Sequence, residues 1–161
     1  MKLATIYLAL FLLSGCGTEG VDMEISDVDG WFKVNESEIT SIVELFKNDR
    51  CLRRVELGSM KYIRQNCKSS PLQETKIKEI QSKLTNLGVV LAVAYTFDNG
   101  NFVANILINR RGIGVSGGGL RISYWETFPL SLNDELECGA IENLYKEKWY
   151  AEILSSEDSC L

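Results

Sequence analysis

Two apolar runs, VVLAVAYTF at 89–97 and FVANILIN at 102–109, flank the turn sequence Asp98-Asn99-Gly100-Asn101. An Asn-Gly pair in this position is the strongest short-range signal for a β-hairpin, because a tight hairpin turn needs residues that adopt positive φ. With Asn99-Gly100 at the centre of the turn, Phe97 faces Phe102 across the strands. We therefore predict a buried face on which the first strand places Leu91, Val93, Tyr95 and Phe97. The opposite face is expected to be half wet and to carry Ala94, Thr96, Asn105 and Asn109.

Two helices are predicted before this hairpin. Ser70-Pro71 supplies an N-cap and a first-turn proline, and Gly88 stands just past the end of an apolar stripe at helical spacing. An earlier helix is expected from residue 36 or 37 to about Lys47, because Asn35 and Glu38 fit a capping box. Apolar residues then recur at helical spacing up to its end.

Further strands are predicted on both sides of the central hairpin. Residues 51–67 contain a Gly58-Ser59 turn and favour two short strands, whereas 112–116 and 120–125 continue the sheet as a meander. Residues 144–154 indicate a closing hairpin, with Trp149, Ala151 and Ile153 pointing inward. The fold class that we predict is α+β, with two helices packed on one face of a mainly antiparallel, meandering sheet of four to six strands in a single domain.

The chain begins with the features of an export signal. Lys2 supplies a positive charge, residues 3–13 are apolar, and the small residues Ser14-Gly15 precede Cys16. A positive, an apolar and a small-residue region in this order are typical of a signal peptide. The apolar run is far shorter than the roughly 20 residues that a membrane-spanning helix needs. We therefore predict that residues 1–15 are a signal peptide.

The sequence Leu13-Ser14-Gly15-Cys16 resembles the lipobox of bacterial lipoprotein precursors. The resemblance covers about a tenth of the chain and implies cleavage before Cys16, diacylglycerol on its sulfur and stable attachment to a membrane through more than one acyl chain. Gly17 stands where the family's inner-membrane retention signal has Asp, which implies the outer membrane, facing the periplasm. The alternative is an ordinary secreted protein with a fortuitous cysteine at the cleavage site.

The folded part is expected to begin near Trp31. Residues 16–30 contain five acidic residues and little that could pack, so we interpret them as a lipidated N-terminus and an acidic tether that keeps the domain clear of the membrane. Residues 31–161 then form one α+β domain.

Five cysteines are an odd number for an exported protein, and lipid on Cys16 would leave four. Four cysteines can close two disulfides in an oxidising envelope, by any of three pairings. We expect the sequence-local pairing, in which Cys51 bonds to Cys67 and Cys138 bonds to Cys160. A metal site is not expected, because the cysteine spacings are long and the chain has no histidine.

The composition argues against several classes of function. The formal net charge is −5, and loss of Lys2 with the signal peptide would make it more negative, so nucleic acid is not an expected partner. Without histidine, Ser-His-Asp and Cys-His catalysis are impossible. We expect no enzyme activity and no cofactor.

Two alternatives stay open: a ligand loop in the glycine-rich segment 112–119, and carboxylate chemistry on glycans. The candidate carboxylates for that chemistry are Glu126, Asp134, Glu135, Glu137 and Glu142.

Aromatic residues on predicted strands are the remaining candidates for a binding site. Tyr124 and Trp125 are neighbours and Tyr150 lies on another strand, so at least one of the first two must point outward. Exposed aromatics can anchor a protein partner, although the rim of the core explains them as well. The sequence thus favours a non-catalytic, lipid-anchored protein-binding module in the periplasm, such as an immunity or inhibitor protein. An envelope-assembly or structural accessory lipoprotein is the main alternative.

Overall fold

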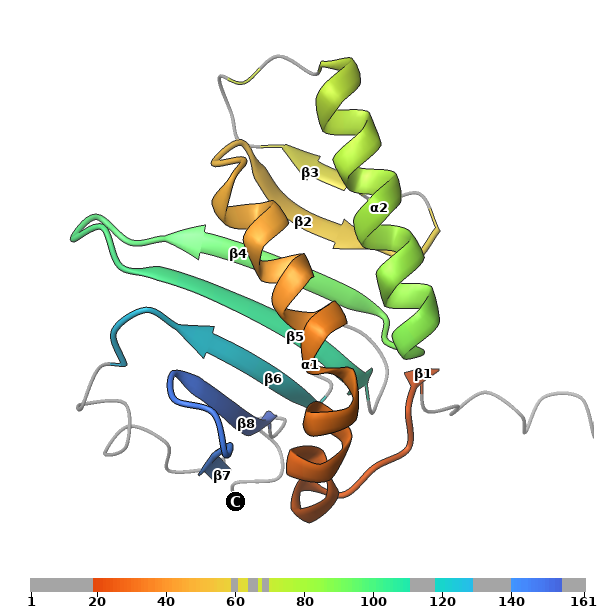
Figure 1. Cartoon of the computed structure of the whole chain (residues 1–161), viewed down its shortest axis with the longest axis vertical. Coiled ribbons are helices and arrows are strands. Elements are labelled where there is room, and N and C mark those ends of the chain that lie inside the picture. Colours follow the sequence, from red (N-terminus) through yellow and green to blue (C-terminus); the bar gives the residue numbers. More distant parts are fainter. Residues whose placement is uncertain are drawn as a thin grey trace, which may run out of the picture.

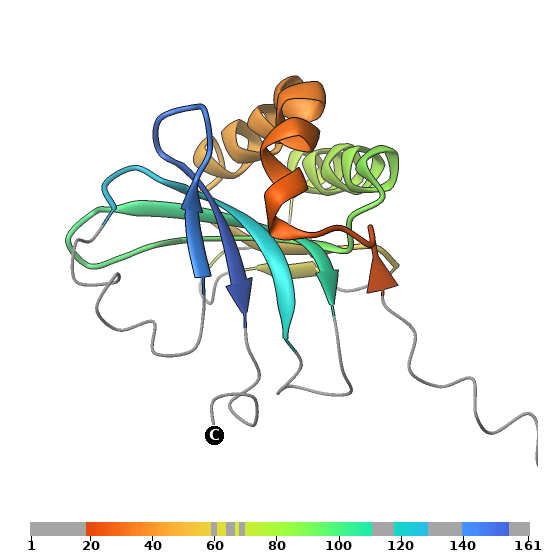
Figure 2. The same ribbon diagram turned by 90° about the horizontal axis from the view of Figure 1, so that it is seen from below.

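The computed structural model describes residues 19–58, 61–63, 67, 70–110, 118–128 and 140–154. Two helices lie together on one face of a single antiparallel sheet (Figures 1 and 2), which confirms the predicted α+β class. The strand order is β3-β2-β4-β5-β6-β8-β7, and β1 pairs with β5 off this path. The elements are β1 Glu19–Gly20, α1 Ile25–Lys47, β2 Leu52–Glu56, β3 Lys61–Ile63, α2 Pro71–Leu87, β4 Leu91–Thr96, β5 Phe102–Arg110, β6 Gly119–Trp125, β7 Ala140–Asn143 and β8 Trp149–Leu154.

The predicted meander is present as β4-β5-β6, in which consecutive strands are neighbours. Six strands in the described ranges have four or more residues, as predicted, and the shorter β1 and β3 bring the sheet to eight. Neither α1 nor α2, the helices of these ranges, is long and apolar enough to cross a membrane.

Helix α2 forms where the sequence predicts it. The Ser70 hydroxyl oxygen accepts a hydrogen bond from the N–H of Gln73 at 3.3 Å, Pro71 is the first helical residue, and Gly88 ends the helix with φ 70°. Cap, proline and glycine each satisfy or remove a main-chain group that the helix ends leave without a partner. The stripe that α2 buries consists of Ile77, Ile80, Leu84 and Leu87.

Helix α1 begins at Ile25, so the predicted start near residue 36 is wrong. Asn35 does not cap the helix, because it lies in the middle of α1. Its side-chain amide donates to the carbonyl of Trp31 at 2.9 Å. The first turns are held by burial, because Val28 and Phe32 are fully buried and the Phe32 ring lies 4.9 Å from that of Trp149. Burying each of these side chains stabilises the helix by about 1.5–3 kcal/mol. This exceeds the roughly 1 kcal/mol that Gly30 costs within α1.

The interpretation of residues 16–30 as a tether is also wrong for its described part. Strand β1 pairs Glu19 with Arg110 of β5, and the N–H of Val21 donates to the carbonyl of Ile108 at 3.1 Å. Gly20 has φ 100°, and a Cβ at this position would lie 2.1 Å from the Ile108 oxygen, so only glycine fits so close to β5. The folded domain therefore includes residues well before Trp31.

The β4–β5 hairpin is present, but its register differs by one residue from the prediction. Phe97 donates through its N–H to the carbonyl of Asn101 at 2.9 Å, so the loop has three residues and Thr96 pairs with Phe102. Of the loop residues, only Gly100 has positive φ. A three-residue loop of this kind ends in a residue with positive φ, whereas the predicted two-residue turn would need two. Asn99 instead uses its side-chain oxygen to accept from the N–H of Asn101 at 2.9 Å.

The slipped register exchanges the two faces of β4. Ala92 and Ala94 belong to the core beneath the helices, whereas Val93 is partly exposed and Phe97 is 44% exposed. On β5, Ile106 and Ile108 lie in the core, whereas Asn109 is fully buried, so its predicted place on the half-wet face is wrong. The closing hairpin β7–β8 is confirmed with Trp149 and Ala151 buried, but Ile153 is 36% exposed and does not point into the core as predicted.

The disulfide between Cys51 and Cys67 is confirmed, with 5.9 Å between the two Cα atoms, and it closes the open end of the β2–β3 hairpin. Cys138 and Cys160 lie outside the described residues, as do Cys16, the signal peptide and the predicted strand 112–116.

Candidate functional site: a cationic hollow at the end of α1

A hollow of about 230 Å³ opens where the C-terminal end of α1 meets β2 and the outer end of the β4–β5 hairpin. Its walls come from segments far apart in the sequence and are formed by Phe46, Lys47, Arg50, Leu52, Arg53, Ala94, Tyr95, Thr96, Gly100, Phe102 and Glu126. The lining combines aromatic and aliphatic side chains with charged groups.

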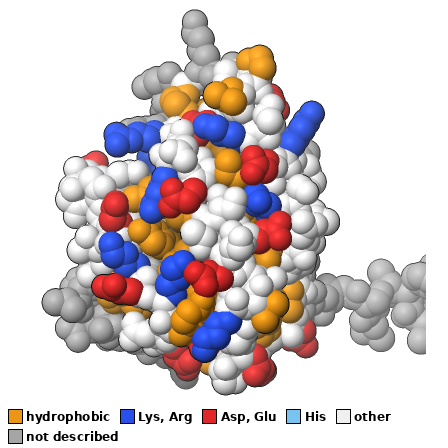
Figure 3. All heavy atoms as spheres, in the orientation of Figure 1, with side chains coloured by type: hydrophobic (Ala, Val, Ile, Leu, Met, Phe, Trp, Pro, Cys, Tyr) orange, Lys and Arg blue, Asp and Glu red, His pale blue; other side chains and the backbone are white. Residues whose placement is uncertain are grey.

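Three of the four charged side chains that line the hollow are basic, namely Lys47, Arg50 and Arg53, and the fourth is Glu126. This excess of positive charge is local, because the whole chain has a net charge of −5. Elsewhere on the face that carries the helices, basic and acidic side chains are interspersed (Figure 3). The hollow is therefore a place where an anionic group meets positive charge on an otherwise acidic protein.

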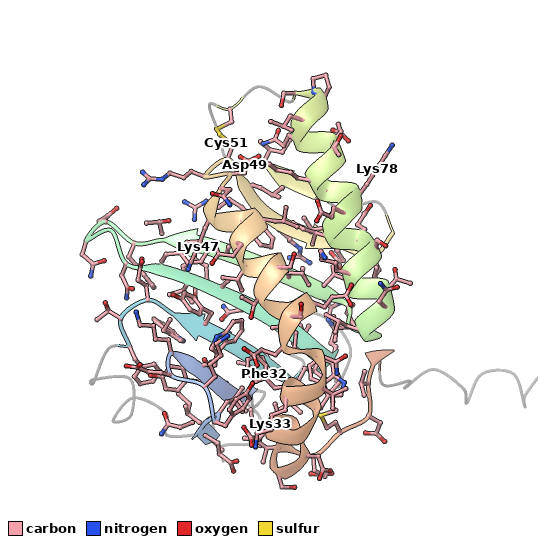
Figure 4. All side chains as sticks on the ribbon, viewed as in Figure 1. Phe32, Lys33, Lys47, Asp49, Cys51 and Lys78 are labelled. Atoms are coloured by element: carbon pink, nitrogen blue, oxygen red, sulfur yellow. A yellow bond between two sulfur atoms is a disulfide. The ribbon has the colours of Figure 1, made fainter. Side chains whose placement is uncertain are left out.

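Lys47 is held over the aromatic wall of the hollow. Its ammonium donates to the hydroxyl of Tyr124 at 3.2 Å and to Glu44 at 3.2 Å, and it lies 4.3 Å from the centroid of the Tyr124 ring and 5.8 Å from that of Phe102. Burial alone would lower the pKa of Lys47, but the hydrogen bonds to Tyr124 and Glu44 outweigh burial and raise it. The side chain leaves α1 on the side of the β4–β5 hairpin (Figure 4).

The turn that follows α1 places Arg50 and Arg53. Asp49 accepts from the N–H of Cys51 at 3.1 Å through its side chain, and its carbonyl accepts from the N–H of Leu52 at 3.0 Å. Lys76 of α2 also forms an ion pair with Asp49 at 3.5 Å. Because the adjoining Cys51 is bonded to Cys67, the turn is fixed by hydrogen bonds, an ion pair and a covalent bond.

The structure separates the three aromatic residues that the sequence singles out. Tyr124 lies on the helix side of β6, with its ring 5.3 Å from Trp149. Trp125 and Tyr150 lie on the other face, and both contact Phe128, at ring distances of 5.5 and 4.3 Å. Trp125 is only 4% exposed, so the structure does not bring these three partner-binding candidates together on one exposed surface. Only Tyr124 takes part in the hollow's surroundings, through Lys47.

The face of the sheet opposite the helices carries a buried ion pair that the sequence did not reveal. Glu152 is 2% exposed and accepts two hydrogen bonds from the guanidinium of Arg121, of which that from Nε measures 2.7 Å. The indole N–H of Trp125 donates to the other oxygen of Glu152 at 3.3 Å. Within the described residues these hydrogen bonds join β6 to β8 on the face opposite the helices.

The alternatives from the sequence are only partly covered by the structure. Glu126 lines the hollow and Glu142 is exposed on β7, whereas Asp134, Glu135, Glu137 and the glycine-rich residues 112–117 lie outside the described part. Within the described part, no group of three or more Cys, Asp or Glu side chains is placed to hold a metal ion.

Sequence reasoning missed Lys47, Arg50 and Arg53 as site residues. The signal in the sequence was a group of basic residues around the end of a predicted helix and beside a cysteine expected to form a disulfide. In comparisons with known proteins, no family model, no curated protein and no solved structure matches the chain. The interpretation of the site therefore rests on its geometry alone.

Proposed function

We propose that the protein is a lipid-anchored envelope lipoprotein that acts as a non-catalytic protein-binding module. In this proposal the cationic hollow receives acidic side chains of a partner in the periplasm. The observation that carries the proposal is the collection of Lys47, Arg50 and Arg53 around one aromatic-walled hollow on an acidic protein. An exported toxin or hydrolase is the partner that we consider first, which would make the protein an immunity or inhibitor protein.

The size of the hollow favours partner side chains over a free metabolite. Its volume of about 230 Å³ lies below the roughly 300–1,000 Å³ of sites that enclose small ligands. It is large enough for one or two carboxylate side chains beside the two guanidinium groups, which bind carboxylates through paired hydrogen bonds. Arginine and aromatic residues are also the types that contribute most binding energy at protein interfaces.

The position of the proposed anchor also supports this function. Cys16 lies three positions before Glu19, so an extended chain limits the distance between the Cys16 Cα and β1 to roughly 11 Å. Strand β1 pairs with the Arg110 end of β5, whereas the hollow includes Phe102 at the other end of that nine-residue strand. The two ends are about 26 Å apart at roughly 3.3 Å per residue. A lipid on Cys16 would thus leave the hollow at the end of the sheet away from the membrane.

The test is affinity capture with the full-length, tagged chain from detergent-solubilised envelopes. The recovery of a bound partner should fall at least tenfold with Arg50→Gln/Arg53→Gln. It should be retained with Lys78→Gln/Lys83→Gln, a control that also removes two positive charges but on α2, where Lys78 points into solvent (Figure 4). Equal recovery with both double variants would contradict the proposed site. Failure to enrich any partner over a secreted Cys16→Ser control would contradict the function itself.

A further inference from the structure

Within the part of the chain that the structure describes, one half of strand β4 has a free edge. β4 pairs with β5 along its whole length, from Leu91 to Thr96, but β2 pairs only with Leu91, Ala92 and Val93. Among the strand pairs of the described ranges, none covers residues 94–96 on the β2 side. Figure 1 shows the same feature, since the β4–β5 hairpin projects past the point where β2 begins.

The main-chain groups on this edge can be assigned from the hairpin. The N–H of Phe97 donates to Asn101 and therefore points towards β5. Successive residues of a strand point their main-chain groups to alternate sides, so those of Thr96 and Ala94 point to the free edge. The guanidinium of Arg53 already lies at this edge and donates to the carbonyl of Ala94 at 3.4 Å. Thr96 is exposed.

The free edge lies between two hollows, one on each face of the sheet. On the helix face is the cationic hollow, and on the open face is a second hollow of about 510 Å³. Ala94, Tyr95, Thr96 and Arg53 line both. Val93 adds an aliphatic side chain to the wall on the open face, next to the Tyr95 ring. Arg54 also lines this hollow, but its guanidinium forms an ion pair with Glu56 at 2.8 Å. The edge therefore offers positive charge on the helix face, and the side chains of Val93 and Tyr95 beside a paired arginine on the open face.

We infer that an extended segment of the protein partner adds to the sheet beside residues 94–96, as a strand that runs antiparallel to β4 next to Leu52 and Arg53, the two β2 residues that do not pair with β4. This inference rests on the proposed function and specifies how the partner binds. Partner residues opposite Ala94 and Thr96 would place their side chains on the helix face, so they are expected to be acidic. The residues between them would contact Val93 and Tyr95 and are expected to be apolar.

A second copy of this chain is a poor occupant of the same edge. Self-pairing across β4 would bring the Arg53 and Arg50 side chains of both copies into one place, and charged residues at an edge are a common means of preventing such pairing. A segment with alternating acidic and apolar residues complements both faces at once. Main-chain hydrogen bonds would supply affinity, and the alternation would supply specificity.

The probe is the synthetic peptide acetyl-Ser-Glu-Val-Asp-Val-Glu-Ser-amide, titrated calorimetrically into the full-length chain in detergent micelles. Added as a strand, it directs the N–H groups of its acidic residues to β4 and those of its valines to solvent. N-methylation of the three acidic residues should weaken binding at least tenfold, whereas N-methylation of the two valines should change it less than threefold. Equal effects of the two modifications, or no binding of the parent peptide at millimolar concentration, would overturn the inference.

Variants of the protein separate this binding mode from the proposed function. Thr96→Pro removes one edge N–H and should weaken the parent peptide at least tenfold, whereas Thr96→Val keeps that N–H and should bind normally. If Arg50→Gln/Arg53→Gln weakens binding but Thr96→Pro does not, the cationic hollow binds acidic side chains without strand addition and the inference fails alone. If recovery of the captured partner is unchanged in Arg50→Gln/Arg53→Gln, both the inference and the proposed function are contradicted.

Discussion

Replacing Asn109 by leucine should destabilise the protein more than its position near the end of β5 suggests. Asn109 is fully buried, and its amide donates to the carbonyl of Val21 at 3.0 Å and accepts from the N–H of Leu120 at 3.1 Å. Leucine would leave both main-chain groups without these partners. A buried unsatisfied group costs about 1–3 kcal/mol, and since Val21 is only partly buried, we expect a total loss of about 2–4 kcal/mol. This corresponds to a decrease in Tm of roughly 5–15 °C for a chain of this size.

Urea unfolding followed by tryptophan fluorescence measures this loss, and Asn105→Leu is the matched control. Asn105 lies on the same strand, but it is half-buried and bonds the hydroxyls of Ser123 and Tyr95 instead of main-chain groups. Of these two hydroxyls, that of Ser123 is fully buried, so replacement of Asn105 should cost about 1–2 kcal/mol, less than that of Asn109. Amide exchange at Val21 should also accelerate in Asn109→Leu, because β1 loses one of its attachments. Equal stability of the two leucine variants would refute the assignment of Asn109 as the residue that fastens β1 to the sheet.

Three further predictions concern stability. Glu152→Gln leaves the Arg121 guanidinium without its buried counter-charge and should lower the free energy of unfolding by about 2–4 kcal/mol in urea titrations, whereas a mild effect would mean that water reaches the pair. Reduction of the Cys51–Cys67 bond should cost about 3 kcal/mol for a loop of this size, to be read from the same titrations with and without reductant. The hydrogen bond that Tyr145 donates to Glu36 raises the pKa of Tyr145 to about 12, so this contact stabilises the fold below pH 10 and its contribution is lost as the pH rises through about 12. Thermal melts of Tyr145→Phe should therefore depend less on pH between these values, and an unchanged slope would contradict the contact.

Elements that depend on neighbours in the sequence could be predicted. Helix α2 carries its cap, its first-turn proline and its terminal glycine within the segment itself, and the disulfide between Cys51 and Cys67 follows from the hairpin that they enclose. Helix α1 depends on distant residues, because its first turns are stabilised by burial of Phe32 against Trp149 of β8. The acidic residues before Trp31 favoured a tether because sequence does not show that partner. Tertiary contacts outweighed the local signal there.

The cationic hollow could not be predicted for the same reason. Lys47, Arg50 and Arg53 are close in sequence, but a basic group becomes a site only when a wall faces it. That wall consists of Phe102 and the outer half of β4. Both follow β3 and α2 in the sequence, so they meet the basic residues only in the folded chain. The extent of the β2–β4 pairing, which leaves the edge open, is a property of the assembled sheet.

The register of one loop connects the fold to the proposed mode of binding. A three-residue loop at Gly100 turns Ala92 and Ala94 towards the helices, where small side chains let α1 pack close to the sheet, and turns Val93 and Tyr95 to the open face. A two-residue turn would reverse β4, since a shift of one residue exchanges every side chain between faces. The large side chains would then lie beneath α1, and the second hollow, on the open face beside the free edge, would lose the side chains of Val93 and Tyr95 from its walls. The conformation of this loop thus determines the chemistry that each face of the edge presents to a partner strand.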